Sequence, residues 1–222
     1  SYDYVIVDEA ARVSPRDLMI SLAQGKKIIL VGDHRQLPHI IDDDVAAQME
    51  DQETLKTSMF QYLFSNRLKS LYEIDKFNRC VTLDKQYRMH PVLGDFVSKN
   101  FYERYNKDEH FDSGLPAKYF VHNLPDTGNC PAMWINVRKG KANREGTSWV
   151  RESEAAEIAK WLGAWMTSTE GAKLDFGVIS FYKAQADLIK EKLVAQDKRF
   201  KEEIRSGRLR IGTVDSFQGM EF

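Results

Sequence analysis

The sequence is poor in features that mark several large classes of protein. Its 222 residues include only two cysteines, Cys80 and Cys130, and neither belongs to a C-x-x-C pair. Two separated cysteines give no support to a zinc site or a disulfide framework, and they favour a reduced, cytoplasmic setting. No apolar stretch approaches the ~18 residues of a membrane-spanning helix, and no signal peptide is recognisable, so we expect no membrane partner.

An excess of charge of either sign is also missing. The chain has 32 Lys and Arg residues against 33 Asp and Glu residues, which gives a formal net charge of -1. This balance removes the argument for nucleic-acid binding that a strongly basic chain would supply, although a local basic groove would be sufficient. The length allows either one large core or two small ones.

The chain lacks the loop with which many proteins bind nucleotide phosphates. That loop has the pattern G-x-x-x-x-G-K-[ST], and its backbone amides and lysine hold the phosphates. Neither Gly25-Lys26 nor Gly140-Lys141 is followed by Ser or Thr. The chain also has no initiator methionine and begins just before an expected strand. We therefore expect it to be a piece of a longer protein.

What is present is an alternation of strands and helices. Apolar runs at 4–7 and 27–31 predict strands buried on both faces, and Ser14 and Pro15 predict the start of a helix that extends to about residue 24. Further strands are expected at 80–83, 133–137, 176–181 and 209–214, and further helices at 59–72, 91–101, 155–166 and 183–196. This order predicts an α/β fold with parallel sheets.

Three stretches give no clear prediction of regular structure. The aspartates at 42–44 are interpreted as a solvated helix start, because acidic side chains favour the first turn of a helix. Residues 103–130 have weak periodicity and many turn formers, so an irregular surface segment is expected. Residues 138–147 are expected to form a basic, glycine-containing loop.

Acidic and amide side chains follow the first two expected strands. Asp8 and Glu9 come directly after residues 4–7, and open α/β sheets present ligands at this carboxyl edge. Asp8 suits a water-mediated ligand of Mg²⁺, and Glu9 could orient or deprotonate a water. Gln36 follows the second strand and suits contact with a terminal phosphate. A solvated strand end and an ordinary glycine turn are the alternatives.

Two later segments carry groups suited to bases and phosphates. Tyr87 offers an aromatic face, and the guanidinium of Arg88 matches a phosphate. Residues 213–219 place hydroxyl groups and a glycine at a strand end, where contacts with a nucleic-acid backbone are possible. A structural tyrosine, a surface arginine and a polar turn would explain the same residues.

The segments together are far more specific than any one of them. In chain order, VDEAA, GDHRQLPH, QYRMHP with FVSKNFYE, and TVDSFQGME resemble motifs II, III, IV and V of superfamily 1B helicases, the branch that includes the nonsense-mediated-decay helicase. GTSWVRESEAAEI and VISFYKAQ resemble further segments of this family. The resemblance spans nearly the whole chain. It implies an enzyme that couples hydrolysis of ATP, with Mg²⁺, to movement along single-stranded DNA or RNA, usually 5′ to 3′.

The resemblance implies roles for four residues of the first domain. Asp8 would bind Mg²⁺ through water, and Glu9 would be the catalytic base. Gln36 would sense the γ-phosphate of ATP. Asp33 would link hydrolysis to the nucleic-acid site.

Further roles are implied for the second domain. Tyr87 would stack on the base of ATP, Arg88 would reach the γ-phosphate, and Glu221 would contact the ribose. Contacts with the nucleic acid would come from Thr213, Ser216, Tyr182 and Gln185.

The implied fold is a pair of RecA-like P-loop NTPase lobes with parallel sheets, a partial one at 1–79 and a second one at 80–222. Motif I and motif VI do not occur in these residues, so we expect the chain by itself to hydrolyse no ATP. A helicase-like scaffold without ATPase activity, which would bind nucleic acid or protein, is the alternative. A magnesium-dependent nuclease that uses the acidic pair would need further converging acids.

Overall fold

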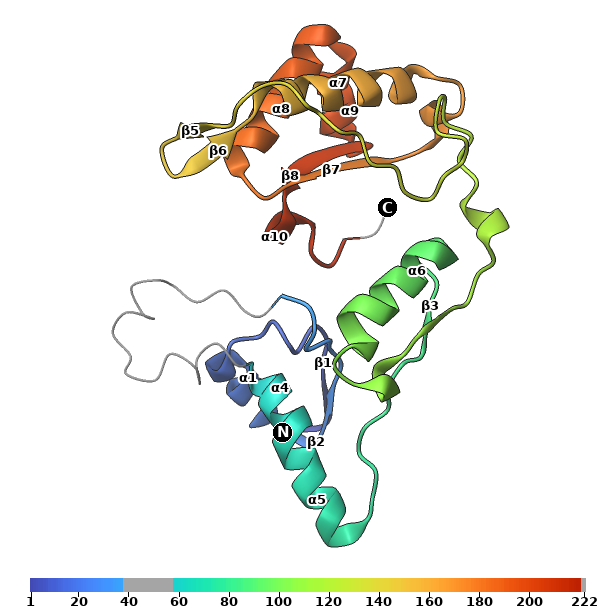
Figure 1. Ribbon diagram of the computed structural model, residues 1–222. Helices are drawn as coiled ribbons and strands as arrows, with labels where there is room; N and C mark the ends of the chain where they lie inside the picture. The colour runs from blue at the N-terminus through green and yellow to red at the C-terminus, as the bar shows by residue number, and fades with distance from the viewer. Residues whose placement is uncertain (38–57, 221–222) are drawn as a thin grey trace. The chain divides into compact units, whose positions relative to one another are not determined.

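The structure is a computed structural model that describes residues 1–37 and 58–220. The chain divides into two compact units (Figure 1). The first unit comprises Ser1–Asp84 and Val97–His110, and the second comprises Lys85–Phe96 and Phe111–Phe222. Glu221 and the aspartates at 42–44 lie outside the described residues.

A parallel strand pair and one helix open the first unit. β1 (Tyr2–Val7) pairs in parallel with β2 (Gly25–Leu30), and α1 (Pro15–Leu22) connects them. The start of α1 is confirmed, because Ser14 Oγ accepts a hydrogen bond from the backbone N of Asp17 at 3.2 Å. The parallel strand–helix–strand order predicted for this region is also confirmed.

The prediction that these two strands are buried on both faces is wrong for the described residues. The side chains of Tyr2, Tyr4 and Ile6 are all more than half exposed, with Ile6 at 66%, and Ile28 and Ile29 are also exposed. Only two strands form this sheet in the described part of the chain, and α1 packs against both. Apolar residues predict a strand, but the number of neighbouring elements decides how deeply the strand is buried.

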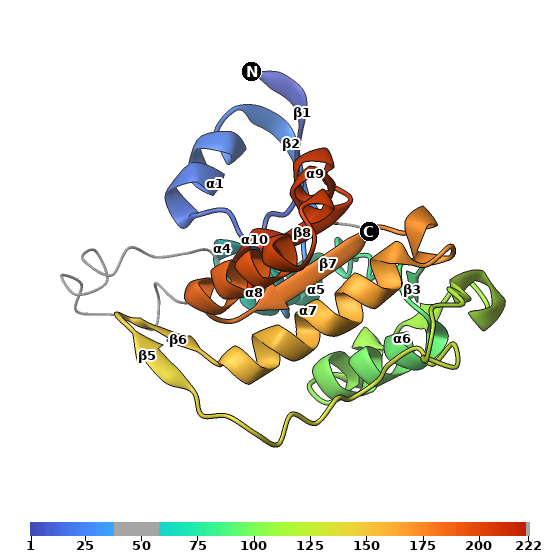
Figure 2. The ribbon, with the colours of Figure 1, turned by 90° about the horizontal axis from the view of Figure 1, so that it is seen from above.

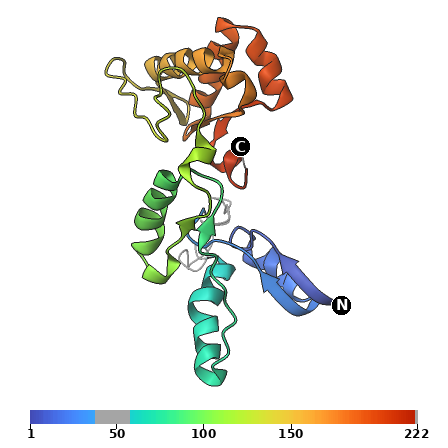
Figure 3. The ribbon, with the colours of Figure 1, turned by 90° about the vertical axis from the view of Figure 1, so that its right-hand side faces the viewer.

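A long helix follows in the first unit, and Figure 3 shows it in cyan as a coiled ribbon. It runs through α4 (Met59–Tyr62), a π-helical turn (Leu63–Arg67) and α5 (Leu68–Asp75). Ser58 caps its start by accepting a hydrogen bond from the backbone N of Gln61 at 3.1 Å. The helix predicted over 59–72 is confirmed.

The first unit is completed by residues 97–110, which the sequence interpretation placed in the second domain. This segment contains a π-helical stretch (Ser98–Glu103) and a 3₁₀ turn (Lys107–Glu109). The two compact units thus differ in their bounds from the predicted domains, 1–79 and 80–222. The assignment of those domains to RecA-like lobes stays a prediction.

Two predicted strands, at 80–83 and 133–137, are not formed. Val81 is 87% exposed and Trp134 is 92% exposed, and neither segment pairs with a strand within residues 1–37 and 58–220. β-Branched and aromatic residues favour a strand only where a partner strand and a packing surface are available. Short apolar runs alone were therefore insufficient to identify strands here.

The second unit begins with short elements. α6 (Pro91–Val97) confirms the helix predicted to start at the proline, and it continues into the π-helical stretch of the first unit. β3 (Lys85–Gln86) pairs in parallel with β4 (Asp112–Ser113), and Ala117–Phe120 forms a 3₁₀ turn. The largely irregular character expected for residues 103–130 is confirmed.

Most of the second unit is built around another parallel strand pair. β7 (Phe176–Ser180) and β8 (Leu209–Thr213) run in parallel along their whole length. The other elements are the antiparallel hairpin of β5 (Asn143–Glu145) and β6 (Ser148–Val150), α7 (Glu152–Thr167), a 3₁₀ turn (Gly171–Lys173), α8 (Lys183–Gln196), α9 (Arg199–Ser206) and α10 (Val214–Phe217). The strands and helices predicted after residue 150 are confirmed, and with them the α/β fold class.

The core of the second unit lies where α7, α8 and α9 meet the β7–β8 pair (Figure 2). Its buried side chains are Ala155, Ala159, Leu162, Met166, Val178, Ile189, Leu193, Phe200 and Leu209. The four that belong to α7 recur at helical spacing and form one apolar face, as the sequence predicts. No helix among the described residues is long and apolar enough to cross a membrane.

This core should be sensitive to loss of volume at Leu193, which is fully buried in α8. Leu193→Ala is expected to lower the free energy of unfolding of the second unit by ~2–5 kcal/mol, because it removes apolar contacts and leaves a cavity. Urea unfolding followed by circular dichroism measures the change. Ile179→Ala is the control, because Ile179 on β7 is mostly exposed. A similar loss in both variants would contradict this account of the core.

Candidate functional site

The loops that follow β1 and β2 meet at one edge of the first sheet. The backbone N of Ala10 donates to the carbonyl O of Val31 at 2.8 Å. A Cβ added to Gly32 would lie 3.0 Å from the backbone N of Ala11, so glycine permits this close approach. Since both strands end here, the segments that carry Asp8 and Gln36 share one carboxyl edge, as the sequence predicts.

The acidic pair lies at the turn that follows β1. Both Asp8 and Glu9 are exposed, and Asp8 Oδ1 accepts a hydrogen bond from the backbone N of Glu9 at 2.9 Å. Glu9 has a left-handed backbone conformation with φ 50, which turns the chain sharply away from the strand. The carboxylate of Glu9 therefore emerges from a defined turn directly beyond the strand end.

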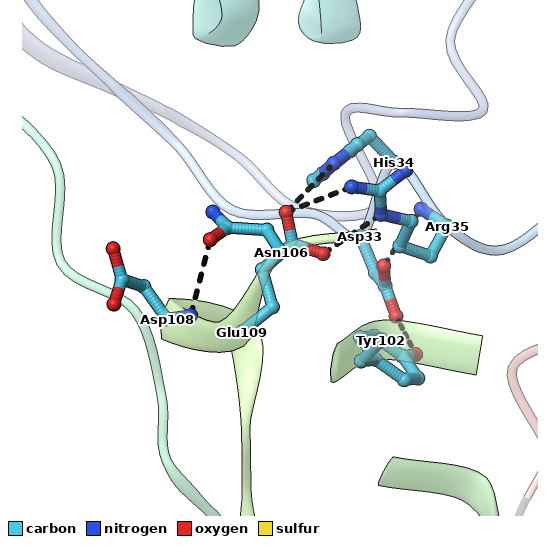
Figure 4. Close-up of polar contacts among 7 residues, drawn as sticks. All are labelled: Asp33, His34, Arg35, Tyr102, Asn106, Asp108 and Glu109. Atoms are coloured by element: carbon cyan, nitrogen blue, oxygen red, sulfur yellow. Dashed lines mark hydrogen bonds and ion pairs between the residues drawn. The ribbon is translucent and has the colours of Figure 1, made fainter. Parts of the chain in front are cut away.

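Asp33 is the centre of a polar network in the loop after β2 (Figure 4). Figure 4 shows that its Oδ2 accepts a hydrogen bond from the hydroxyl of Tyr102 and its Oδ1 accepts one from the backbone N of Arg35 at 2.9 Å. The same Oδ2 accepts a hydrogen bond from Gln36 Nε2 at 2.9 Å. A carboxylate only accepts hydrogen bonds, so the NH₂ group of Gln36 must face Asp33. The Gln36 side chain also interacts with the hydroxyl of Tyr102, so Asp33, Gln36 and Tyr102 form one connected set.

A second tie joins the same loop to residues 97–110. Arg35 donates to Glu109 through Nε at 2.7 Å and Nη2 at 2.9 Å, and Figure 4 shows this paired contact. The guanidinium of Arg35 also lies over the ring of Tyr105, with its central carbon 4.5 Å from the ring centre. Because Glu109 is only 9% exposed, this paired geometry supplies partners for a charge that is largely shielded from water.

The network changes the proton affinity of its members. Burial raises the pKa of the Tyr102 hydroxyl well above its usual range, and the hydrogen bond to Asp33 adds to the shift. Burial lowers the pKa of His34, helped by the charge of Arg35, while Glu109 and Asp33 oppose this effect. The hydrogen bond to Glu109 raises the pKa of Arg35. Near neutral pH, Tyr102 is therefore a fixed donor to Asp33.

The donor set fits a magnesium ion that is bound mainly by water and phosphate. Within residues 1–37 and 58–220, no group of three or more His, Cys, Asp or Glu side chains could hold a metal. Mg²⁺ commonly uses one or two carboxylates and completes its shell with waters and substrate phosphates. Asp8 is exposed, and its Oδ2 makes no hydrogen bond within the described part of the chain, so it suits such a ligand.

In the second unit, Gln86 holds the loop that carries Tyr87 and Arg88. Gln86 Oε1 accepts hydrogen bonds from the backbone N of Arg88 at 2.9 Å and of Met89 at 2.8 Å, and its Nε2 donates to the carbonyl O of Met89. A Cβ on Gly114 would lie 2.2 Å from the ring of Tyr87, so this ring lies directly against the glycine backbone. Tyr87 is otherwise exposed and can offer an aromatic surface.

The four predicted nucleic-acid residues lie near the carboxyl end of the β7–β8 pair but in different environments. Thr213 ends β8, and the exposed Ser216 donates from its hydroxyl to the carbonyl O of Thr213 at 2.7 Å. Tyr182 is exposed just before α8. Gln185 is only 7% exposed, and its amide bonds both the N and the O of Arg151, so in this unit it has a structural role.

Comparison with known protein families shows which family the chain belongs to. A family model described as an AAA domain matches residues 55–222, and a second model with the same description matches residues 1–43. The chain belongs to the AAA-domain family. The resemblance to superfamily 1B helicases is thereby confirmed, and the mixed α/β fold with parallel strand pairs agrees with RecA-like lobes.

Several curated proteins are similar to the chain along almost all of its length. A regulator of nonsense transcripts 1 homolog from Neurospora crassa is 31% identical over 98% of the chain and 18% of its own length. ATP-dependent helicase upf1 of Schizosaccharomyces pombe is 29% identical over 98% of the chain and 22% of its own length. ATP-dependent helicase NAM7 of Saccharomyces cerevisiae is 29% identical over 98% and 21%. The chain thus spans about a fifth of the length of these relatives.

Three residues of the first unit's network were not identified from the sequence. Arg35 lies between two candidate residues, so its position was a usable signal. Tyr102 and Glu109 are more than 60 residues away from the loop that they hold. Tyr102 lies within the helicase-like FVSKNFYE segment and Glu109 lies after it, but no rule of sequence spacing connects either residue with Asp33. Only tertiary structure reveals that contact.

The Arg35–Glu109 contact should stabilise the loop of residues 33–37 against local unfolding. In Glu109→Gln, the guanidinium loses its charged partner, so the free energy of local opening is expected to fall by ~1–3 kcal/mol. Native-state hydrogen exchange at the backbone amides of this loop measures it. Asp3→Asn is the control, because the Asp3–Lys26 pair of the same unit is exposed. Equal exchange in Glu109→Gln and Asp3→Asn would contradict a clamping role.

Proposed function

We propose that the protein to which this chain belongs is an ATP-dependent helicase or translocase that moves along single-stranded DNA or RNA in the 5′ to 3′ direction. The supporting observation is that the acidic pair and the Asp33–Gln36 network lie on adjoining loops at one carboxyl edge of a parallel sheet. In a family whose members include proteins named ATP-dependent helicases, this edge is suited to nucleotide hydrolysis. A cytoplasmic location is part of the same proposal.

In this proposal, the exposed acids act on ATP. Asp8 holds Mg²⁺, and the ion supplies charge neutralisation for the phosphate groups when it is bound. Glu9 accepts a proton from the attacking water, which makes the water a better nucleophile. Gln36 contacts the γ-phosphate or the water through its exposed side-chain amide, which Asp33 orients. Asp33 passes the state of the nucleotide to the rest of the unit through Tyr102.

The second unit supplies the remaining contacts. Tyr87 stacks on the adenine base, and Arg88 stabilises the charge that develops on the γ-phosphate. Glu221, outside the described residues, contacts the ribose by resemblance alone. Thr213, Ser216 and Tyr182 meet the nucleic acid. Gln185, buried against Arg151, supports this surface from behind.

The proposal predicts a selective defect for Glu9→Gln in the full-length protein. The ATP hydrolysis rate should fall by ~10²–10⁴, because the amide cannot accept the proton of the water. Unwinding should be lost, while nucleic-acid binding that depends on ATP persists. A coupled ATPase assay and a strand-displacement assay measure the two activities, and Glu73→Gln, an exposed acid on α5, is the control.

Two outcomes of this experiment would contradict the proposal. Normal hydrolysis in Glu9→Gln would remove Glu9 from the reaction, and an unmutated protein that binds nucleic acid without any ATPase would favour the scaffold. The 222-residue polypeptide tested separately should show no turnover, because it contains no phosphate-binding loop. Steady hydrolysis by that polypeptide, free of contaminating ATPase, would overturn this part of the proposal.

A further inference from the structure

Residues 138–144 of the second unit form a concentrated basic segment. They include Arg138, Lys139, Lys141 and Arg144 and no acidic residue, in a chain whose net charge is -1. All four side chains are exposed, and none forms an ion pair within residues 1–37 and 58–220. Other arginines of this unit do have acidic partners: Arg151, Arg199, Arg205 and Arg208. The segment therefore carries positive charge that the described part of the protein does not neutralise.

The basic segment and the hairpin that follows it are held in place by several hydrogen bonds. Ser148 Oγ of β6 accepts a hydrogen bond from the backbone N of Ala184 at the start of α8, at 3.2 Å. Gln185 bonds the backbone N and O of Arg151, and Arg151 Nη2 donates to the carbonyl O of Val137 at 2.7 Å. These contacts fix the chain at Val137, just before the basic segment, and at Ser148 and Arg151 after it, so the charges of the segment are presented from a defined position.

The exposed face of the hairpin joins a cation with an aromatic ring. Arg144 and Trp149 are direct cross-strand partners in the antiparallel β5–β6 pair, so both side chains lie on the same face. Trp149 is 41% exposed. Glu145 lies on the opposite face, because consecutive strand residues alternate. Arg144 Nε donates to the carbonyl O of Gly146 at 2.9 Å, which leaves its two terminal nitrogens without a hydrogen bond in the described residues.

The hairpin lies next to the surface already assigned to nucleic acid. β6 packs beside α8 (Figure 1), and α8 begins three residues after β7 ends at Ser180. Ser180 is the direct partner of Thr213 in the parallel pair. Within the second unit, the β5–β6 hairpin, with the basic segment that leads into it, thus adjoins the carboxyl edge of the β7–β8 pair, near Thr213 and Tyr182.

We propose that residues 138–144 and Trp149 form an additional binding surface for single-stranded nucleic acid. This inference rests on the proposed function. The lysines and arginines bind backbone phosphates and release counterions, and Trp149 stacks on a base beside the guanidinium of Arg144. Both kinds of contact are independent of base sequence. The surface would lengthen the stretch of single-stranded nucleic acid that the second unit binds, without selecting for a particular base sequence.

The test compares two triple variants of the 222-residue chain by fluorescence anisotropy with labelled oligo(dT) and oligo(U), over a range of salt concentrations. Lys139→Gln/Lys141→Gln/Arg144→Gln should weaken binding by at least ~10-fold near 0.1 M salt and reduce the slope of log K against log salt by up to ~2. Lys190→Gln/Lys198→Gln/Lys201→Gln has the same loss of charge at exposed positions of α8, of the residue just before α9 and of α9, and it should bind like the unmutated chain.

A second measurement does not depend on any variant. Hydrogen exchange of the unmutated chain should show protection of residues 138–150 when oligo(dT) is added. In a separate comparison of two variants, Trp149→Phe should bind oligo(dT) more tightly than Trp149→Leu, because it keeps an aromatic ring for stacking. If Lys139→Gln/Lys141→Gln/Arg144→Gln leaves the oligonucleotide affinity and its salt dependence unchanged, this inference alone is overturned. Failure of the unmutated chain to bind either oligonucleotide would overturn the nucleic-acid part of the proposed function as well. Protection by polyglutamate but not by the oligonucleotides would assign the hairpin to an acidic protein partner.

Discussion

The carboxylate of Asp33 is the group on which the candidate site of the first unit depends. It accepts hydrogen bonds from Gln36, from the backbone N of Arg35 and from Tyr102. An ionised carboxylate can only accept hydrogen bonds, so all three groups act as donors to it. The paired contact between Arg35 and Glu109 holds the same loop a second time. The sheet beneath is a partly exposed pair of strands. Contacts from residues 97–110 therefore add to the strand β2 in positioning the loop.

Glutamine amides have a comparable task in the second unit. Gln86 satisfies three backbone groups of the turn that carries Tyr87 and Arg88, and Gln185 satisfies two backbone groups of Arg151 beside the basic hairpin. A primary amide can donate and accept at once, so it replaces the partners that irregular backbone lacks. Exposed side chains next to both segments are thereby presented from an ordered backbone, which favours binding because less conformational entropy is lost.

The sequence predicted elements well where local signals were strong and failed where burial or pairing decided the result. Ser14 predicted the start of α1, and the apolar spacing of α7 predicted its buried face. Residues 80–83 and 133–137 have strand-like composition but no partner strand among the described residues. The shared edge of Asp8 and Gln36 followed from parallel topology. The contact of Tyr102 with Asp33 did not, because no local pattern links residues so distant in the chain.

We propose that Tyr102 acts on ATP hydrolysis through Asp33 and Gln36. A double-mutant cycle on ATP hydrolysis in the full-length protein tests it, with Tyr102→Phe and Gln36→Ala made singly and together. Tyr102→Phe should lower kcat while leaving KM for ATP unchanged, and it should cause no further loss when Gln36 is already replaced. Independent effects, in which the double variant loses the product of both single losses, would contradict the claim.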